Sequence, residues 1–334
     1  MKLSAGELHD RTIVIDGMGG SAKAFQLQKA GGVTAINVSV AWNQERMDDV
    51  VAQVVSYLDL VEQFPNDVLI VETVSDIQEA KRADKVGIIL GTQGLASIGQ
   101  DLNWISMLQR IGVRISGLVY NETGVIGSSC AEKSDTGLTS FGRQVVSELD
   151  RRGIVIDLSH TGDRTSLDAV ELSRHPVVIS HSNIRRLVDH PRNAPDDLIK
   201  AVAIAGGVIG LTQYGPLLDP GRGPLPTIKD WLEHIRYAVD LVGIDHVGLG
   251  MDGFDGMYSW RWWYDYMTQY RELVPARYLE PEFANINTHN IQGYSSNADL
   301  RDLTEGLIGL GYSNDDIAKI LGLNLLRVYQ KVWA

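Results

Sequence analysis

Residues 154–182, IVIDLSHTGDRTSLDAVELSRHPVVISHS, contain two short apolar runs, and a histidine follows each of them. Ile154–Asp157 and Val177–Ile179 lack the polar alternation of a half-exposed strand, so they are typical of strands buried on both faces. The segment between them has the pattern of an amphipathic helix. The stretch therefore predicts a β-α-β unit with parallel strands.

His160 and His181 are the histidines that follow these two strands. Parallel strands point their carboxyl ends the same way, so both side chains should emerge at one rim of the sheet. Two imidazoles there form half of a metal or catalytic site. Alternatively, each histidine caps its strand and bonds a neighbouring carbonyl. For two histidines at equivalent positions, we favour the metal or catalytic interpretation.

The alternation of apolar runs and helical stretches continues on both sides of residues 154–182. Eight apolar runs, most of them separated by helical stretches, match a (β/α)8 TIM barrel better than a doubly wound sheet. A further short run, Val68–Val71, has no clear place. The eight predicted strands are Thr12–Asp16, Ala35–Val40, 87–94, Gly117–Asn121, Ile154–Asp157, Val177–Ile179, Val208–Tyr214 and 246–252.

Length and composition fit this architecture. A chain of 334 residues can bury a large core, and an α/β barrel of this size is routinely one domain. We expect a single barrel domain over residues 1–334, with C-terminal helices from about 285 to 334. The formal net charge of -12 argues against a nucleic-acid surface, which needs clustered Lys and Arg.

The cysteine count and the apolar runs bear on location. Cys130 is the only cysteine, which excludes an intrachain disulfide and a thiolate metal cluster. The first residues, MKLSAGELHDR, do not resemble a secretory signal, and no apolar run is long enough to span a bilayer. We therefore expect a soluble cytoplasmic protein without a membrane partner.

The barrel hypothesis also selects candidate site residues, because catalytic groups in such barrels follow the carboxyl ends of the strands. The residues in those positions are Met18 to Gly20, Gln93, Tyr120 with Asn121, His160, His181, Gln213 with Tyr214, and Asp252.

Five longer motifs occur in the order seen in one family of zinc peptidases. They are GLTSFGRQVVSELDRRGIVIDLSH (137–160), VVISHSN (177–183), HPRNAPDDLI (190–199), VGLGMDGFDG (247–256) and GYSNDDIAKILGLNLLRV (311–328). The chain thereby resembles the membrane (renal) dipeptidase family, over most of its length. The resemblance implies an amidohydrolase-type barrel that holds two zinc ions bridged by a carboxylate, hydrolyses dipeptides and tends to form homodimers.

Three positions match the family's ligands. His160 and His181 match the two histidines of its second metal, and Asp252 matches the aspartate after strand eight. The family's D-F-D-G is one residue longer here, so Asp255 is a weaker candidate for the same role.

Three other positions depart from the family's ligands. Met18 and Gly20 stand where the family has a histidine and an aspartate, and Gln93 stands where it has the bridging glutamate. A thioether and a bare backbone do not hold zinc, and a neutral amide is a poor bridge between two dications. We expect the first metal site to be absent, which leaves at most one zinc per chain.

Two substrate-binding positions follow from the same resemblance. Tyr120 replaces the family histidine that polarises the scissile carbonyl, and a phenol can still donate to a developing oxyanion. Arg192 matches the arginine that clamps the substrate carboxylate, a role suited to a bidentate guanidinium. The alternative for Arg192 is an ordinary surface arginine.

Two functional hypotheses remain. In the first, a hydrolase of a small carboxylate-bearing amide or peptide holds one zinc with His160, His181 and Asp252. Asp252 then either ligates or acts as general base, while Gln93 is a weak fourth ligand or orients the water. In the second, the barrel is metal-free, and it binds a small ligand or runs acid-base chemistry without a metal.

Residues 258–270, YSWRWWYDYMTQY, are dense in aromatics on the predicted catalytic side. They could line the pocket, form a lid or make a cage for a cationic ligand. We favour packing against the C-terminal helices or a second subunit, where Trp and Tyr are enriched. The histidines away from the strand ends, His9, His175, His190, His234 and His246, are expected to be structural.

Overall fold

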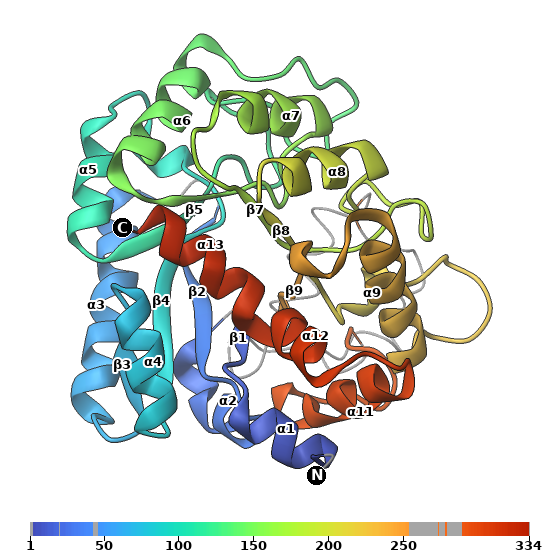
Figure 1. Cartoon of the computed structure of the whole chain (residues 1–334). Helices are drawn as coiled ribbons and strands as arrows, with labels where there is room; N and C mark the ends of the chain where they lie inside the picture. Colours follow the sequence, from blue (N-terminus) through green and yellow to red (C-terminus); the bar gives the residue numbers. More distant parts are fainter. Residues whose placement is uncertain are drawn as a thin grey trace.

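The structure is a computed structural model that describes residues 3–19, 21–42, 46–253, 273, 278 and 289–333. Eight parallel strands follow one another round a near-closed barrel (Figure 1), which confirms the predicted (β/α)8 architecture. The barrel strands are β1 (Ile15–Asp16), β2 (Ala35–Ala41), β4 (Val86–Thr92), β5 (Val113–Gly117), β6 (Val155–Asp157), β7 (Val178–Ser182), β8 (Val208–Leu211) and β9 (Val247–Leu249).

Two strands depart most from the prediction, and the others overlap the predicted ranges with different limits. The unplaced run forms β3 (Val68–Ile70), which pairs with the start of β4 because β5 occupies that edge of β4 only from Leu90 onward. The predicted strand Gly117–Asn121 is wrong, since β5 is Val113–Gly117, four residues earlier. The apolar residues after Gly117 therefore leave the barrel as a loop.

The helices cover the outside of the barrel. Within the described residues, no helix combines the length and apolarity that crossing a bilayer requires. The α-helices are α1 (Ala5–Arg11), α2 (Phe25–Ala30), α3 (Met47–Gln63), α4 (Val74–Arg82), α5 (Asn103–Arg110), α6 (Ser140–Arg152), α7 (Asp163–Leu172), α8 (Asp196–Ile204), α9 (Ile228–Val242), α11 (Arg301–Gly309), α12 (Asn314–Ala318) and α13 (Asn324–Val332). Shorter helical turns are η1 (Ala22–Ala24), η2 (Ala96–Ile98), η3 (Gly215–Leu217), η4 (Ile244–His246), η9 (Asn297–Asp299) and η10 (Lys319–Leu323).

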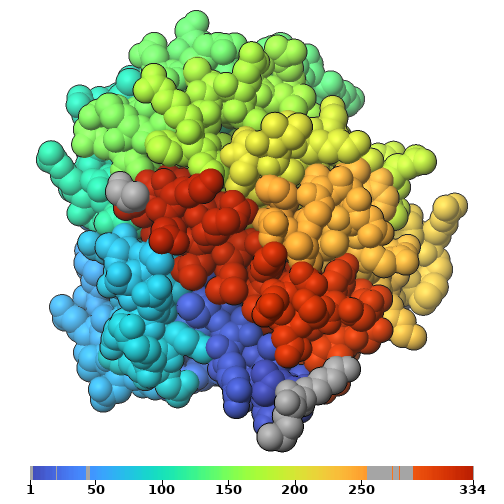
Figure 2. Space-filling model, in the orientation of Figure 1, coloured from blue at the N-terminus to red at the C-terminus, as the bar shows by residue number. Residues whose placement is uncertain are grey.

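Helix α13 closes the end of the barrel at which the strands begin. Its Leu325, Val328 and Tyr329 are buried against the first residues of the strands, such as Val155 and Val208. Figure 1 shows α13 lying across the strands, and Figure 2 shows the C-terminal helices covering the middle of this face. A functional site must therefore open at the opposite end, where the strands finish.

Asp16 joins the two strands at which the barrel closes. The backbone N–H of Gly17 donates to the carbonyl of Leu249 at 2.9 Å, and the N–H of Met251 donates to Oδ1 of Asp16 at 2.8 Å. Oδ2 of Asp16 accepts from the amide of Asn297 at 3.2 Å. Burial raises the pKa of this carboxyl to about 7. Asp16 thus links β1 to β9, a structural role for a residue at the end of the first strand.

His234 in α9 holds the segment that follows β7. Its Nδ1 accepts the backbone N–H of Ile184 at 3.0 Å, and burial lowers its pKa to about 4. The folded-state pKa thus lies below the unfolded value near 6.5. The unfolded chain binds the proton more readily, so the stabilisation is complete above about pH 6.5 and is lost as the pH falls toward 4.

We therefore expect the His234→Gln variant to lose less stability in acid than the native protein, because glutamine can accept the same N–H without titrating. Between pH 6.5 and 4 the difference should approach about 3 kcal/mol, because each tenfold difference in proton affinity between the folded and unfolded states is worth about 1.4 kcal/mol. Urea unfolding at four pH values across this range would measure it. Parallel pH profiles for the two proteins would contradict the assignment.

Candidate active site

His160 and His181 meet at the open end of the barrel, as the β-α-β pattern predicts. Their Nε2 atoms are 3.0 Å apart, and their ring centroids are 5.0 Å apart. Both side chains are buried, with exposed fractions of 7% and 0%. The two histidines therefore face each other instead of bonding separate carbonyls, and the alternative of two independent strand caps is wrong.

A neighbouring amide fixes the tautomer of His160. Its Nδ1 lies 2.7 Å from Oδ1 of Asn121, in the loop after β5. An amide oxygen can only accept, so Nδ1 carries the proton and donates it. Nε2 of His160 is then left with a lone pair, and that lone pair points toward His181.

A two-step hydrogen-bond chain fixes His181 in the same way. Its Nδ1 lies 2.7 Å from Oγ of Ser180, and the Ser180 hydroxyl donates its only proton to Oδ2 of the buried Asp157. The Ser180 oxygen must therefore accept from Nδ1 of His181. Nε2 of His181 is left bare as well, and it faces the bare Nε2 of His160.

Two nitrogen lone pairs 3.0 Å apart repel each other unless a proton or a cation lies between them. Two zinc ligands with tetrahedral geometry and Zn–N bonds of 2.0–2.1 Å would be about 3.3 Å apart, close to the observed separation. Burial lowers the pKa of both histidines well below the ordinary value, and the charge of Arg192 lowers it further. The neutral, pre-oriented pair fits a borderline-soft divalent metal such as zinc.

We expect the Ser180→Ala variant to bind zinc about 10- to 100-fold more weakly, because outer-shell hydrogen bonds orient a metal-binding imidazole. A competition titration with a chromophoric chelator would measure the affinity. The matched control is Ser147→Ala, whose hydroxyl bonds only along its own helix, to the Arg143 carbonyl at 3.0 Å. Unchanged affinity in Ser180→Ala would show that this chain does not prepare His181.

Two residues at this end of the barrel have a backbone conformation that residues other than glycine rarely adopt. Among the described residues, only Asp84, His160 and Asp252 are non-glycine residues with positive φ. His160 has a φ of 65° and Asp252 a φ of 52°, both in the left-handed region. Such strain persists where the surrounding structure holds it, often at functional sites. Two of the three positions are candidate site residues.

Arg192 lies directly behind the histidine pair. Its Nη2 donates to the backbone carbonyl of His181 at 3.1 Å, and the side chain is only 7% exposed. The alternative of an ordinary surface arginine is therefore wrong. His190 holds the loop, because its Nδ1 accepts the Arg192 N–H at 3.1 Å and its Nε2 donates to the Leu273 carbonyl at 2.9 Å.

Asp252 follows β9 at the same end of the barrel. Its backbone N–H donates to the carbonyl of Met18 at 2.6 Å. Burial raises its pKa to about 6, while the charge of Arg192 opposes that rise. In the described part of the chain, no three His, Cys, Asp or Glu side chains are grouped closely enough to hold a metal ion. The two histidines therefore lie together, but Asp252 does not form a three-residue metal-binding group with them in this structure.

Tyr120, Gln93 and Met18 lie around the same opening. The Tyr120 ring is 4.2 Å from the His160 ring, centroid to centroid, at an angle of 34°. Gln93 follows β4 and is half-buried, and it makes no hydrogen bond to either histidine. Met18 is fully buried beyond β1. The structure thus brings Tyr120 to the histidines and leaves Gln93 in the surrounding wall.

The sequence prediction missed some residues of this site, and some of the residues it named lie outside the described part of the chain. Asp157 and Ser180, which orient His181, were not among the predicted site residues, and Asn121 was selected without a role. Their signal is their position on or after the barrel strands: Asp157 ends β6, Ser180 precedes His181 within β7, and Asn121 lies in the loop after β5. Asp255 and the aromatic segment 258–270 lie outside the described residues.

Comparison with known proteins shows which family the sequence matches. Residues 21–292 match the sequence profile of the family "Membrane dipeptidase (Peptidase family M19)". The chain is 25% identical to "Dipeptidase tcpJ" of Claviceps purpurea, over 88% of this chain and 62% of that protein. It is 28% identical to "Dipeptidase aclJ" of Aspergillus oryzae, over 80% of this chain and 57% of that protein. The chain thus spans about three fifths of the length of these curated relatives.

Solved structures agree with this assignment. An amidohydrolase from Pseudomonas aeruginosa superposes with a TM-score of 0.85, at 31% identity and over 99% of both chains. The probable dipeptidase PvdM from the same organism shares the fold, with a TM-score of 0.83 at 22% identity over 98% of this chain and 97% of that one. The predicted amidohydrolase type of the barrel is confirmed. Since the family profile spans most of the sequence, the chain belongs to the membrane dipeptidase family, peptidase family M19.

Proposed function

We propose that the chain is a dipeptidase-like metallohydrolase with at most one zinc ion, held by His160, His181 and Asp252. The observation that carries the proposal is the pair of bare Nε2 atoms, 3.0 Å apart and each fixed by a hydrogen bond on its other ring nitrogen. A divalent cation there supplies Lewis-acid activation of water and of an amide carbonyl.

The remaining residues of the site have roles that follow from their positions. Tyr120, against the His160 ring, is placed to donate its hydroxyl to the oxygen of the reacting carbonyl. Asp252 offers a carboxylate that either completes the ligand set or takes a proton from the attacking water. Arg192, behind His181, carries the buried positive charge that would bind the substrate carboxylate.

The limit of one zinc rests on the residues at the other family positions. Met18 and Gln93 offer a thioether and a neutral amide, and neither replaces a hard charged ligand. We propose that the first metal site is degenerate. Gln93 then serves the site as a polar wall residue or a weak fourth ligand. From the length of the chain and its barrel pattern we propose one barrel domain over residues 1–334, and from the resemblance to the family we propose a homodimer.

The substrate class follows from Arg192 and from the curated relatives, which are dipeptidases. We propose a small amide or peptide that carries a carboxylate on the leaving side of the scissile bond. A buried guanidinium without such a partner is costly, and a carboxylate satisfies it bidentately.

Elemental analysis and dipeptide hydrolysis on protein purified without chelators would test the proposal. We expect about one zinc per chain, loss of hydrolysis after chelator dialysis, and its return when zinc is added. Two tightly bound ions per chain would overturn the single-site assignment. No metal and no hydrolysis, even with zinc supplied, would leave the metal-free alternative.

A further inference from the structure

A hollow lies next to the histidine pair, since Tyr120, whose ring packs against the His160 ring, is one of its lining residues. It has a volume of about 370 Å³, within the range of roughly 300–1,000 Å³ typical of small-molecule pockets. It is lined by Trp42, Ala96, Gly99, Leu118, Val119, Tyr120, Glu122, Thr123, Gly124, Val125 and Ile126.

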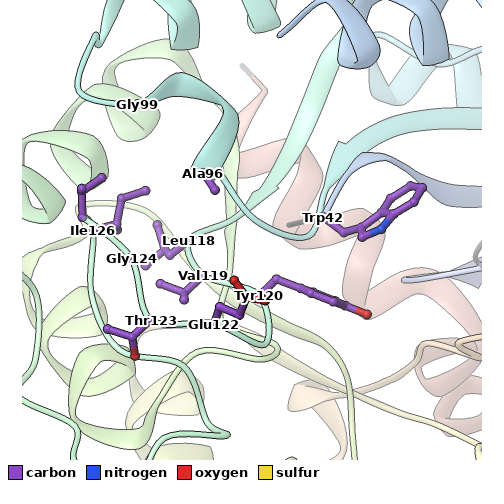
Figure 3. A pocket seen from close by; sticks show the side chains of 11 residues that line it. Trp42, Ala96, Gly99, Leu118, Val119, Tyr120, Glu122, Thr123, Gly124 and Ile126 are labelled. Carbon is purple, nitrogen blue, oxygen red and sulfur yellow. The ribbon is translucent and has the colours of Figure 1, made fainter. Parts of the chain in front are cut away.

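The walls of this cavity are mostly apolar. Figure 3 shows the rings of Trp42 and Tyr120 at one end, and Leu118 and Ile126 at the other. Val125 is 40% exposed there. Such a hollow releases water favourably when it receives an apolar group.

The loop that forms most of the cavity is held in place by its own hydrogen bonds. The carbonyl of Val125 accepts the Thr139 hydroxyl at 2.5 Å, and the carbonyl of Ile126 accepts the Thr139 N–H at 3.0 Å. Ser129 donates its hydroxyl to the carbonyl of Asn121 at 3.0 Å. Because Asn121 also orients His160, the cavity wall and the histidine pair form one connected structure.

Successive contacts connect the residues of the site from Arg192 to Tyr120. Arg192 contacts His181 at 3.1 Å, His181 contacts His160 at 3.0 Å, and the His160 ring lies 4.2 Å from that of Tyr120. Tyr120 also lines the cavity. A substrate whose carboxylate reaches Arg192 and whose amide reaches the histidines would therefore direct its remaining end past Tyr120.

We propose that this cavity is the specificity pocket for a large apolar side chain on the amino side of the scissile amide, a step that rests on the proposed function. Leucine and phenylalanine side chains fit inside it and displace part of its water, whereas glycine leaves it hydrated. The preference for the larger group should be about 10- to 100-fold in kcat/KM.

Hydrolysis of Leu-Ala, Phe-Ala and Gly-Ala by the native protein and by Ala96→Trp would test the pocket. Ala96 is exposed at the start of η2, so the indole would occupy the cavity without displacing core side chains. We expect the ratio of kcat/KM for Leu-Ala over Gly-Ala to fall about 10- to 100-fold in this variant. Val125→Asp, which places a charge in the apolar end, should reduce the same ratio. Ala52→Trp, exposed on α3, is the matched control and should leave it unchanged.

The outcomes of these assays distinguish a failure of the proposed specificity pocket from a failure of the proposed hydrolase function. Hydrolysis with no preference for Leu-Ala, or with the same ratio in native and Ala96→Trp protein, would overturn the pocket and leave the proposed function standing. If the native protein hydrolyses none of the three, the proposed function fails, and the intact dipeptides become binding probes for calorimetry. Tighter binding of Leu-Ala than of Gly-Ala, reduced in Ala96→Trp, would still support the pocket. Equal binding, or none, would overturn it.

Discussion

Replacement of His181 by alanine should remove bound zinc and lower kcat/KM for dipeptides by at least about 10³-fold. The variant deletes one of the two facing Nε2 atoms and leaves His160 alone at the site. A single imidazole with one carboxylate does not hold zinc tightly. Elemental analysis and hydrolysis rates on the same preparation would show both losses together.

His160→Ala should give the same result, since the two imidazoles act as one unit. His175→Ala is the matched control, because His175 is a half-buried histidine just before β7, at the other end of that strand. Urea unfolding of the three variants would separate loss of metal from loss of fold. A His181→Ala protein that stays folded, binds one zinc and hydrolyses dipeptides would refute the assignment of the pair.

The position of this pair could be predicted from sequence because it depends on topology alone. Two fully apolar runs with a helical segment between them require parallel strands, and parallel strands finish at one rim. Asp157 of β6 pairs with Val178 of β7, and each histidine lies three residues beyond its residue of that pair, so no side-chain geometry was needed to bring them together. The burial of Arg192 was less certain, because a loop arginine can face the solvent equally well.

The network behind the histidines could not be predicted in the same way. Asn121 reaches His160 across 39 residues, and Asp157 reaches His181 only through Ser180. Such contacts depend on the side-chain directions of polar residues that have many other uses. The limits of β5 were also missed, because Leu118 and Val119 are as apolar as a strand although they leave the sheet to line a cavity.

Replacement of Arg192 by methionine should lower kcat/KM for dipeptides with a free carboxylate by about 10²- to 10³-fold, the loss expected for a bidentate charged contact. Methionine keeps much of the buried volume and removes the charge. The same dipeptide with a carboxy-terminal amide cannot form that contact in either protein. Its kcat/KM should therefore change far less, so the ratio between acid and amide substrates reports carboxylate binding directly.

Arg186→Met is the matched control, since Arg186 is exposed in the same loop and should not affect the ratio. Arg192 also donates to the His181 carbonyl, so a purely structural role would weaken zinc binding and slow both substrates equally. Zinc content and the acid-to-amide ratio therefore have to be measured together. An unchanged ratio with reduced zinc would make Arg192 a positioning residue for His181. A reduced ratio with full zinc occupancy would place the substrate carboxylate at Arg192, behind the histidine pair and away from the aromatic end of the cavity.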